Sequence, residues 1–466
     1  MPAIHGYTCR ALTLDEVPLL LDHLDAVFGA VNSVTGRRGA PRGFFEHHWD
    51  CDDQRDVRGC FGAFDEPSGR LVASVRVYSR AMRLHSETSI ALASATEQSL
   101  ETGPCASTIP IGGIGDVATR SEHRGKGLAH ALLHLADDYM RSQFPLAVLH
   151  AGPAVVPVYS KQGWQSIPLS STTISVSASL LSHDIASFDA SNNCITPIDF
   201  QNPSHLALIK ALYNLTAPTI LGSFTRHSDF YWSEYVGTCR DPRRIPCRIM
   251  YTENGKRVSE LQDGDNAGYL LAEIMRHDVQ SAISAFEKNN HDACVVNVLL
   301  LDLFAGKLSK TTTNANLSVE AAAALQLHTT LSALFSQMIE STLKPLLPQH
   351  VPMDAIKICL TFPTALLPNE ALNAMANNFN SKHRDDNIKS WADQQFRKTD
   401  IDTGFMFKIY KPFNINGPKK VISTVNDLET VLGPLDAGQT QPYAMCQDVV
   451  LKEGGPVFGF FKADRF

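Results

Sequence analysis

The stretch GDVATRSEHRGKGLA, residues 115–129, decides the fold. An apolar, β-prone segment leads into it from residue 109, and an amphipathic pattern with leucine and alanine on one face follows it to about residue 143. A strand that passes through a glycine-rich basic turn into a helix presents several backbone N–H groups at one point, where the helix dipole also favours an anion. The stretch therefore predicts a phosphate-binding loop between a strand and a helix.

The residue types in this loop suit a pyrophosphate. Gly125 and Gly127 allow the main chain to approach the phosphates closely, because glycine has no Cβ atom. Arg124 and Lys126 add positive charge beside the helix N-terminus. A basic glycine turn by itself is more often an ordinary loop. Its position between this strand and this helix is what makes it a candidate site.

Composition limits the classes of function. The chain has 466 residues, 44% of them hydrophobic and 19% charged, which predicts a globular protein of two or three domains. A net charge of -7 gives no electrostatic reason to bind nucleic acid or an anionic membrane. Its ten cysteines show no CxxC pair and are interpreted as free thiols in a reducing compartment. With no signal-peptide pattern and no apolar stretch of about 20 residues, we expect a cytoplasmic protein.

Hydrophobic periodicity predicts two similar halves. Up to residue 168 it indicates the order strand, two helices, three strands, helix, strand and helix. A second succession of helix, strands, long helix and strand follows residue 170, which favours a degenerate second copy. The clearest predicted elements are helices at 14–29, 127–143, 204–213 and 318–343, and strands at 109–119, 146–152, 247–260, 267–275, 293–304 and 355–363.

The segment VATRSEHRGKGLAHALL, residues 117–133, resembles the signature of the GNAT superfamily, in which an (R/Q)-x-x-G-x-(G/A) loop joins the fourth strand to the third helix. The resemblance implies the acyl-CoA N-acyltransferase fold, a mixed α/β (α+β) sheet, with acetyl-CoA as cosubstrate. Main-chain groups of the bulged, splayed fourth strand then hold the pantetheine arm, and the loop holds the pyrophosphate. The implied strand residues are Val117, Ala118 and Thr119, and the implied loop residues are Arg124, Gly125, Lys126, Gly127, Leu128 and Ala129.

A second element, PVYSKQGW at residues 157–164, resembles the Y-x-K-x-G-(F/W) element of the same family. The resemblance assigns Tyr159 as the acid that protonates the departing thiolate. A phenol keeps its proton at neutral pH and can donate it there. One departure is the Ala-Gly-Pro sequence at 151–153, where many relatives carry Asn or Ser.

Two further segments resemble the Eis-like tandem acetyltransferases: IPIGGIGDVAT at 109–119 and the terminal DRF. In that branch a second GNAT-like domain lacks the coenzyme loop, and the C-terminal carboxylate acts as the base, a role that Phe466 would carry here. A plain packed strand end is the alternative for this aromatic tail. The resemblance implies a catalytic domain over 1–168, a degenerate GNAT-like domain over 169–400 and a β-rich C-terminal segment over 401–466 that ends at the active site. The last segment is too short for the sterol-carrier-like domain of that branch.

The combined prediction is direct transfer of an acetyl group from acetyl-CoA to a primary amine on a small molecule or a lysine-bearing substrate. Asp116 is a second candidate base, as the carboxylate near the strand position where many GNATs carry Glu. We predict no metal, because His130 and His134 lack a third ligand. The alternatives are a non-catalytic acyl-CoA-binding regulatory protein, another acyl group or acceptor, and a second half that serves only as an interaction scaffold. A homo-oligomer is left open.

Overall fold

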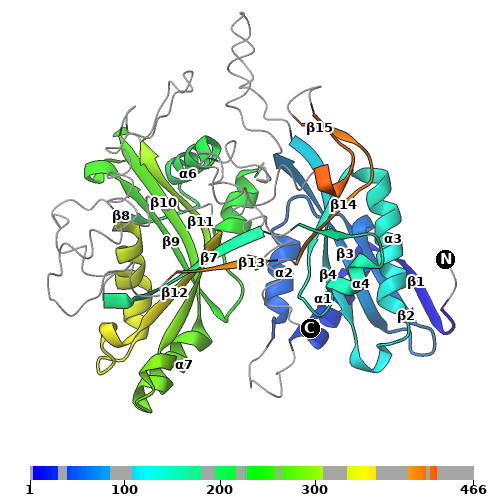
Figure 1. Ribbon diagram of the computed structural model, residues 1–466, viewed down its shortest axis with the longest axis horizontal. Coiled ribbons are helices and arrows are strands. Elements are labelled where there is room, and N and C mark those ends of the chain that lie inside the picture. Colours follow the sequence, from blue (N-terminus) through cyan, green and yellow to red (C-terminus); the bar gives the residue numbers. More distant parts are fainter. Residues whose placement is uncertain are drawn as a thin grey trace, which may run out of the picture.

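The computed structural model contains two seven-stranded mixed sheets and a two-stranded ribbon within its described residues (Figure 1). The sheets form the two halves of the molecule, and α2 lies between them. Most of the first half comes from the N-terminal part of the chain and most of the second from the middle. The described residues are 4–29, 39–83, 108–167, 169–179, 195–216, 226, 228–257, 260–261, 265–307, 333–363, 397–402, 404–415 and 420–427.

The first sheet has helices on both faces. One face packs against α1 (Val17–Phe28) and α2 (Arg42–Asp50), and the other packs against α3 (Leu128–Gln143) and α4 (Val156–Ser160). The two apolar layers follow from strand alternation, because neighbouring residues such as Val148 and Leu149 point to opposite faces. In spatial order the strands are β1 (Tyr7–Ala11), β2 (Cys60–Asp65), β3 (Leu71–Arg83), β4 (Thr108–Thr119), β5 (Leu146–His150), β14 (Phe405–Ile409) and β6 (Gln165–Ser166).

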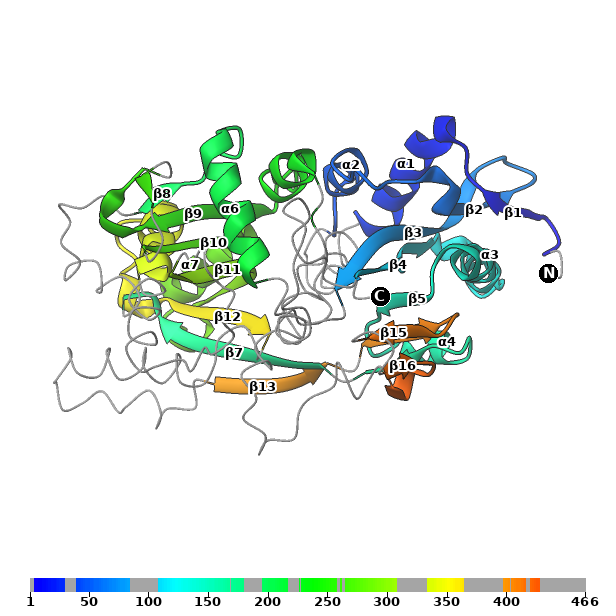
Figure 2. The ribbon, with the colours of Figure 1, turned by 90° about the horizontal axis from the view of Figure 1, so that it is seen from above.

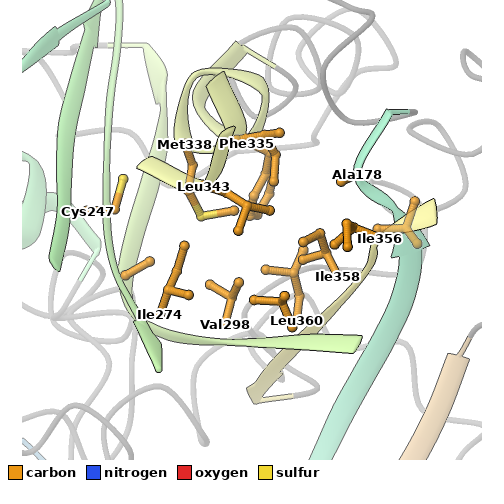
Figure 3. Packing of buried hydrophobic residues seen from close by; sticks show 14 of the residues in the cluster. Ala178, Cys247, Ile274, Val298, Phe335, Met338, Leu343, Ile356, Ile358 and Leu360 are labelled. Atoms are coloured by element: carbon orange, nitrogen blue, oxygen red, sulfur yellow. The ribbon is translucent and has the colours of Figure 1, made fainter. Parts of the chain in front are cut away.

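The second sheet is covered in the same way, with α6 (Pro203–Thr216) on one face and α7 (Arg276–Glu287) with the helical segment 333–343 on the other. Figure 3 shows Phe335, Met338 and Leu343 packed over side chains from the sheet. In spatial order the strands are β8 (Ile195–Pro197), β9 (Arg244–Thr252), β10 (Asn266–Met275), β11 (Val295–Lys307), β12 (Lys357–Pro363), β7 (Leu169–Ser177) and β13 (Arg397–Asp402). The ribbon pairs β15 (Phe413–Ile415) with β16 (Lys420–Ile422).

The two sheets share one plan, with β8 to β12 repeating β1 to β5. Within the described strands, β4 and β5 are the parallel pair of the first sheet, and β11 and β12 are that of the second. A one-residue bulge interrupts β4 where it pairs with β3, and another interrupts β11 where it pairs with β10. The predicted fold class is confirmed: a mixed α/β structure whose length suits a tandem arrangement.

The outer strands of the two sheets are exchanged. The position beside β5 is occupied by β14, from the C-terminal part of the chain. In contrast, β7, which directly follows the first unit in sequence, pairs with β12 in the second sheet (Figure 2). Each sheet therefore needs strands from both halves of the sequence. The boundaries at 168/169 and 400/401 stay predictions, and a sequential division does not anticipate this exchange.

Several predicted elements differ from the structure at their ends. The helix predicted over 14–29 is α1 and begins at Val17, because Leu14–Glu16 forms a 3-10 turn, and the strand predicted over 146–152 ends at His150. The strand predicted over 247–260 ends at Thr252, because Glu253–Gly255 forms a 3-10 turn with Gly255 at φ 65°. The helix predicted from residue 127 begins at Leu128, with Gly127 as its left-handed N-cap. Phe466, the aromatic tail and part of the helix predicted over 318–343 lie outside the described residues.

Candidate acyl-CoA site

The site begins where β4 leaves β5. The strands pair in parallel from Ile111 opposite Leu146 to Gly113 opposite Val148, and no pairing between them continues beyond that point in the part of the chain that is described. β4 nevertheless runs on to Thr119 beside β3. Its main-chain edge toward β5 therefore lacks a partner strand over the predicted pantetheine residues, Val117, Ala118 and Thr119.

A bulge adds to this splay. Between the pairs Arg76–Gly115 and Ser74–Ala118, β4 carries one residue more than β3. Asp116 lies in the bulge and has φ 53°, a left-handed conformation that aspartate tolerates better than most residues. Such bulges re-aim main-chain and side-chain groups near functional sites. The bulge places the Asp116 side chain beside β3 on the face of the sheet that carries α1 and α2.

The predicted phosphate loop joins β4 to α3. Gly125 has φ 75° and Gly127 has φ 81°, so both need the conformational freedom of glycine. A Cβ atom added to Gly125 would meet nothing within 4 Å, which leaves the space beside the loop open. The first N–H groups of α3 have no partners within the helix and point toward that end. The backbone therefore fits an anion, and the coenzyme-binding role of the loop stays a prediction.

Side chains fix the shape of this loop. The Nε atom of Arg124 donates to the carbonyl oxygen of Thr119 at 3.1 Å, which folds the loop back onto the end of β4. Lys126 Nζ donates to the hydroxyl of Tyr7 at 2.6 Å, and the same hydroxyl lies 2.9 Å from Nδ1 of His123. β1 thus anchors the basic loop through Tyr7, a residue that sequence reasoning missed.

Tyr159 lies on α4 and is buried in the apolar cluster that also holds Leu128 and Ala151. Its ring meets the ring of Trp164 edge-on, with 6.5 Å between centroids. Gly163, at φ 84°, ends the turn after α4. The structure therefore places Tyr159 in the apolar layer on the α3 and α4 face of the first sheet. Its role as acid stays a prediction.

Asp116 is 3% exposed. The Tyr78 hydroxyl donates to its Oδ2 at 2.8 Å, and Arg76 Nη1 lies 3.8 Å from the same oxygen. Its Oδ1 is buried with no hydrogen-bond partner in the described structure. Burial raises the pKa of Asp116 to about 6, although Arg76 and Tyr78 act to lower it. A buried carboxylate with one unused oxygen is suited to accept a proton near neutral pH.

A buried charge network surrounds Asp116. Arg80 donates from both Nη atoms to the two oxygens of Asp52, at 3.1 Å each, and Arg76 Nη2 reaches Asp52 at 3.3 Å. Sequence analysis missed these residues because they come from separate segments. One available signal was the alternation Arg76, Tyr78, Arg80, which places two arginines on one face of an otherwise apolar strand.

The second half closes this network. The helical turn Tyr231–Val236, a π-helix labelled η7 here, contacts α2: the Tyr235 hydroxyl lies 2.6 Å from His48 Nδ1, and the Tyr235 carbonyl oxygen lies 3.1 Å from His47 Nε2. Arg80 lies over the Tyr231 ring at 5.9 Å. Burial lowers the pKa of His47 to about 4 and that of His48 well below its usual value. These neutral histidines join the two halves.

We expect Gly125→Ala to weaken acyl-CoA binding, because a methyl group would occupy the open space that the phosphates need. Gly69→Ala is the matched control, since Gly69 also has positive φ and also has nothing within 4 Å of an added Cβ. Both changes incur a similar backbone cost, about 1–2 kcal/mol. Calorimetric titration with acetyl-CoA should show weaker binding only for Gly125→Ala. Equal affinities in the two variants would remove the loop from the site.

Comparison with known proteins agrees with this geometry. Residues 91–167, a range that includes β4, the loop, α3, β5 and α4, match the acetyltransferase (GNAT) domain family. Over these residues the first unit is therefore similar to GNAT acetyltransferase domains, and this similarity supports acyl-CoA-dependent acyl transfer in general. No curated protein matches the chain.

Several solved structures are similar over most of the chain. A GCN5-related N-acetyltransferase from Anabaena variabilis is 12% identical, with 88% of this chain and 76% of that chain covered and a TM-score of 0.47. Eis1 from Mycobacterium abscessus is 12% identical, with 87% and 74% covered and a TM-score of 0.42. Saccharomyces cerevisiae N-myristoyltransferase with bound myristoyl-CoA is 10% identical, with 88% and 84% covered and a TM-score of 0.49. At TM-scores below 0.5 these similarities carry no argument about activity.

None of the described helices combines the length and apolar character needed to cross a membrane. In the same residues, no group of three or more His, Cys, Asp or Glu side chains is arranged to hold a metal ion. His130 and His134 contact each other edge-on, and His130 Nδ1 accepts from Gln162 Nε2 at 2.8 Å if that nitrogen is unprotonated.

Proposed function

We propose that the protein is an acetyl-CoA-dependent N-acetyltransferase that acts by direct transfer on a primary amine of a small molecule or a lysine-bearing substrate. The observation that carries the proposal is the course of β4. This strand leaves β5 at Gly113, bulges at Asp116 and passes through two left-handed glycines into α3. An extended thiol arm and a pyrophosphate together require such a strand edge followed by such a loop.

The residues present fit acetyl-CoA, which supplies the thioester. Main-chain groups of Val117, Ala118 and Thr119 would hold the pantetheine arm. The N–H groups of residues 125–129, with the cations of Arg124 and Lys126, would hold the pyrophosphate. The fit rests on the unpaired strand edge and on the open space beside Gly125.

In the proposed reaction the amine nitrogen attacks the thioester carbonyl carbon, so that a C–N bond forms and the C–S bond breaks. Tyr159 donates its hydroxyl proton to the departing thiolate. The amine proton passes to a base. The terminal carboxylate of Phe466 is the base that the family resemblance proposes, and Asp116 is the candidate that its buried, unpartnered Oδ1 supports.

Coenzyme A release tests the function. Acetyl-CoA is supplied with polyamines, lysine peptides and aminoglycosides, and longer acyl-CoA donors in the same assay measure acyl preference. Turnover on at least one amine is expected. Binding of acetyl-CoA by calorimetry without turnover on the whole panel would instead favour a regulatory acyl-CoA-binding protein.

Two variants separate the candidate bases. Asp116→Asn is expected to lower kcat about 10²–10⁴-fold if Asp116 takes the proton. Deletion of residues 463–466 should do so if the terminal carboxylate is the base. Asp50→Asn is the control, because Asp50 forms an exposed ion pair with Arg240 at 2.8 Å. Full activity in one of the two test variants would exclude the corresponding base.

A further inference from the structure

We propose that Asp52, Arg76 and Tyr78 are positioning residues for acyl transfer, because they hold the Asp116 carboxylate in place and control its charge. The inference rests on the proposed function, in which Asp116 accepts the proton of the acceptor amine. It goes beyond that function by assigning the pH dependence of the reaction to a buried network that does not itself touch substrate.

The geometry leaves one oxygen of Asp116 for the reaction. Its main chain is fixed by Ser74, whose hydroxyl donates to the Asp116 carbonyl oxygen at 2.9 Å. Its Oδ2 accepts the Tyr78 hydrogen bond at 2.8 Å. These contacts leave Oδ1, buried and without a partner in the described residues, as the atom that can accept a proton. An N–H donor from a substrate would satisfy that oxygen.

The charges in the network compete. Arg80 donates two hydrogen bonds of 3.1 Å to Asp52. Arg76 is shared, because its guanidinium lies 3.3 Å from Asp52 and 3.8 Å from Asp116. Asp52 therefore draws Arg76 away from Asp116 and adds a negative charge nearby. Burial raises the pKa of Asp116, and Asp52 limits the opposing effect of Arg76 because it binds the same guanidinium.

The other titratable groups facing this network stay uncharged near pH 6. Burial raises the pKa of the Cys60 thiol on β2 to about 12 and that of Tyr231 on η7 to about 12, and it raises the pKa of Tyr235 well above its usual value. Burial also lowers the pKa of His48 on α2 well below its usual value. The charge on Asp116 therefore responds chiefly to Arg76 and to the Tyr78 hydrogen bond, and Asp52 acts through Arg76.

Two substitutions should move the acid limb of the pH profile of kcat/KM in opposite directions. Tyr78→Phe removes a hydrogen bond that stabilises the carboxylate, so the pKa of Asp116 rises and the limb moves about 1 unit toward higher pH. Asp52→Asn removes an anion and frees Arg76 for Asp116, so the pKa falls and the limb moves about 1 unit toward lower pH. Asp116→Asn should abolish the limb.

Tyr139→Phe is the matched control, because the Tyr139 hydroxyl also donates to an aspartate, Asp56, at 3.2 Å, but outside the network. The acid limb of the Tyr139→Phe pH profile should lie where that of the wild type lies. Circular dichroism checks the fold, and if Asp52→Asn does not fold, Tyr78→Phe decides alone, since it removes only a hydroxyl. If the acid limbs of Tyr78→Phe and Asp52→Asn stay where the wild-type limb lies, or move in the same direction, the proposed positioning role is wrong. Absence of turnover by the wild type on every amine would overturn the proposed function as well.

Discussion

A chain that ends at residue 167 is expected to lose the folded first unit and, with it, acyl-CoA binding. This result follows from the exchanged strand β14, which pairs with β5 from Phe405 opposite His150 to Ile409 opposite Leu146. Phe407 is 0% exposed, and truncation of a buried phenylalanine to alanine alone costs about 3–5 kcal/mol. Loss of the whole strand removes a comparable or larger share of the about 5–15 kcal/mol that stabilises a typical domain.

Polar contacts also make α3 depend on the C-terminal part of the chain. Lys408 Nζ donates to Asp137 Oδ1 at 2.7 Å and to the carbonyl oxygen of Gln162 at 2.8 Å, and the Tyr410 hydroxyl donates to Asp137 Oδ1 at 2.6 Å. Burial by itself raises the pKa of Asp137, but the two donors hold it below its usual value. Because α3 begins at the phosphate loop, the C-terminal part of the chain helps to position that loop.

The measurement compares residues 1–167 alone with residues 1–167 co-expressed with 168–466. Soluble yield, circular dichroism and calorimetric titration with acetyl-CoA are the readouts, and the second fragment should restore all three. A fragment 1–167 that folds cooperatively and binds acetyl-CoA as the full chain does would contradict the expectation. That result would favour the view that the second half is a separate interaction scaffold.

The second large effect is expected from Tyr159→Phe, which should lower kcat about 10²–10⁴-fold while the Kd for acetyl-CoA stays unchanged. Phenylalanine keeps the ring that packs edge-on against Trp164, so the fold is retained and only the proton donor is lost. Steady-state release of coenzyme A gives kcat, and calorimetry gives Kd.

Tyr139→Phe again serves as the control, because it removes a tyrosine hydroxyl that is hydrogen-bonded to Asp56, away from Tyr159. Its kcat should match that of the wild type. Unchanged turnover in Tyr159→Phe would remove Tyr159 from the mechanism. A rise in the Kd for acetyl-CoA with unchanged kcat would assign the hydroxyl to binding.

The features that sequence analysis predicted correctly are local ones. The helix expected within 14–29 is α1, the strand expected over 109–119 is β4, and the basic loop between β4 and α3 has left-handed glycines at Gly125 and Gly127. Each depends on contacts between residues a few positions apart, so the pattern of apolar and glycine residues is sufficient to indicate it. The loop that we propose for the coenzyme could be located in the sequence for the same reason.

The sequence by itself therefore determined the GNAT-type strand, loop and helix and the repeat of this plan along the chain. Only the tertiary structure decided the exchange of β7 and β14, because strands in equivalent positions of two similar sheets carry no local signal of which sheet they join. It also decided the network of Asp52, Arg76, Arg80 and Asp116, closed by Tyr235 from the other half. Burying these charges is tolerable only when they meet one another, and that meeting depends on how distant segments pack.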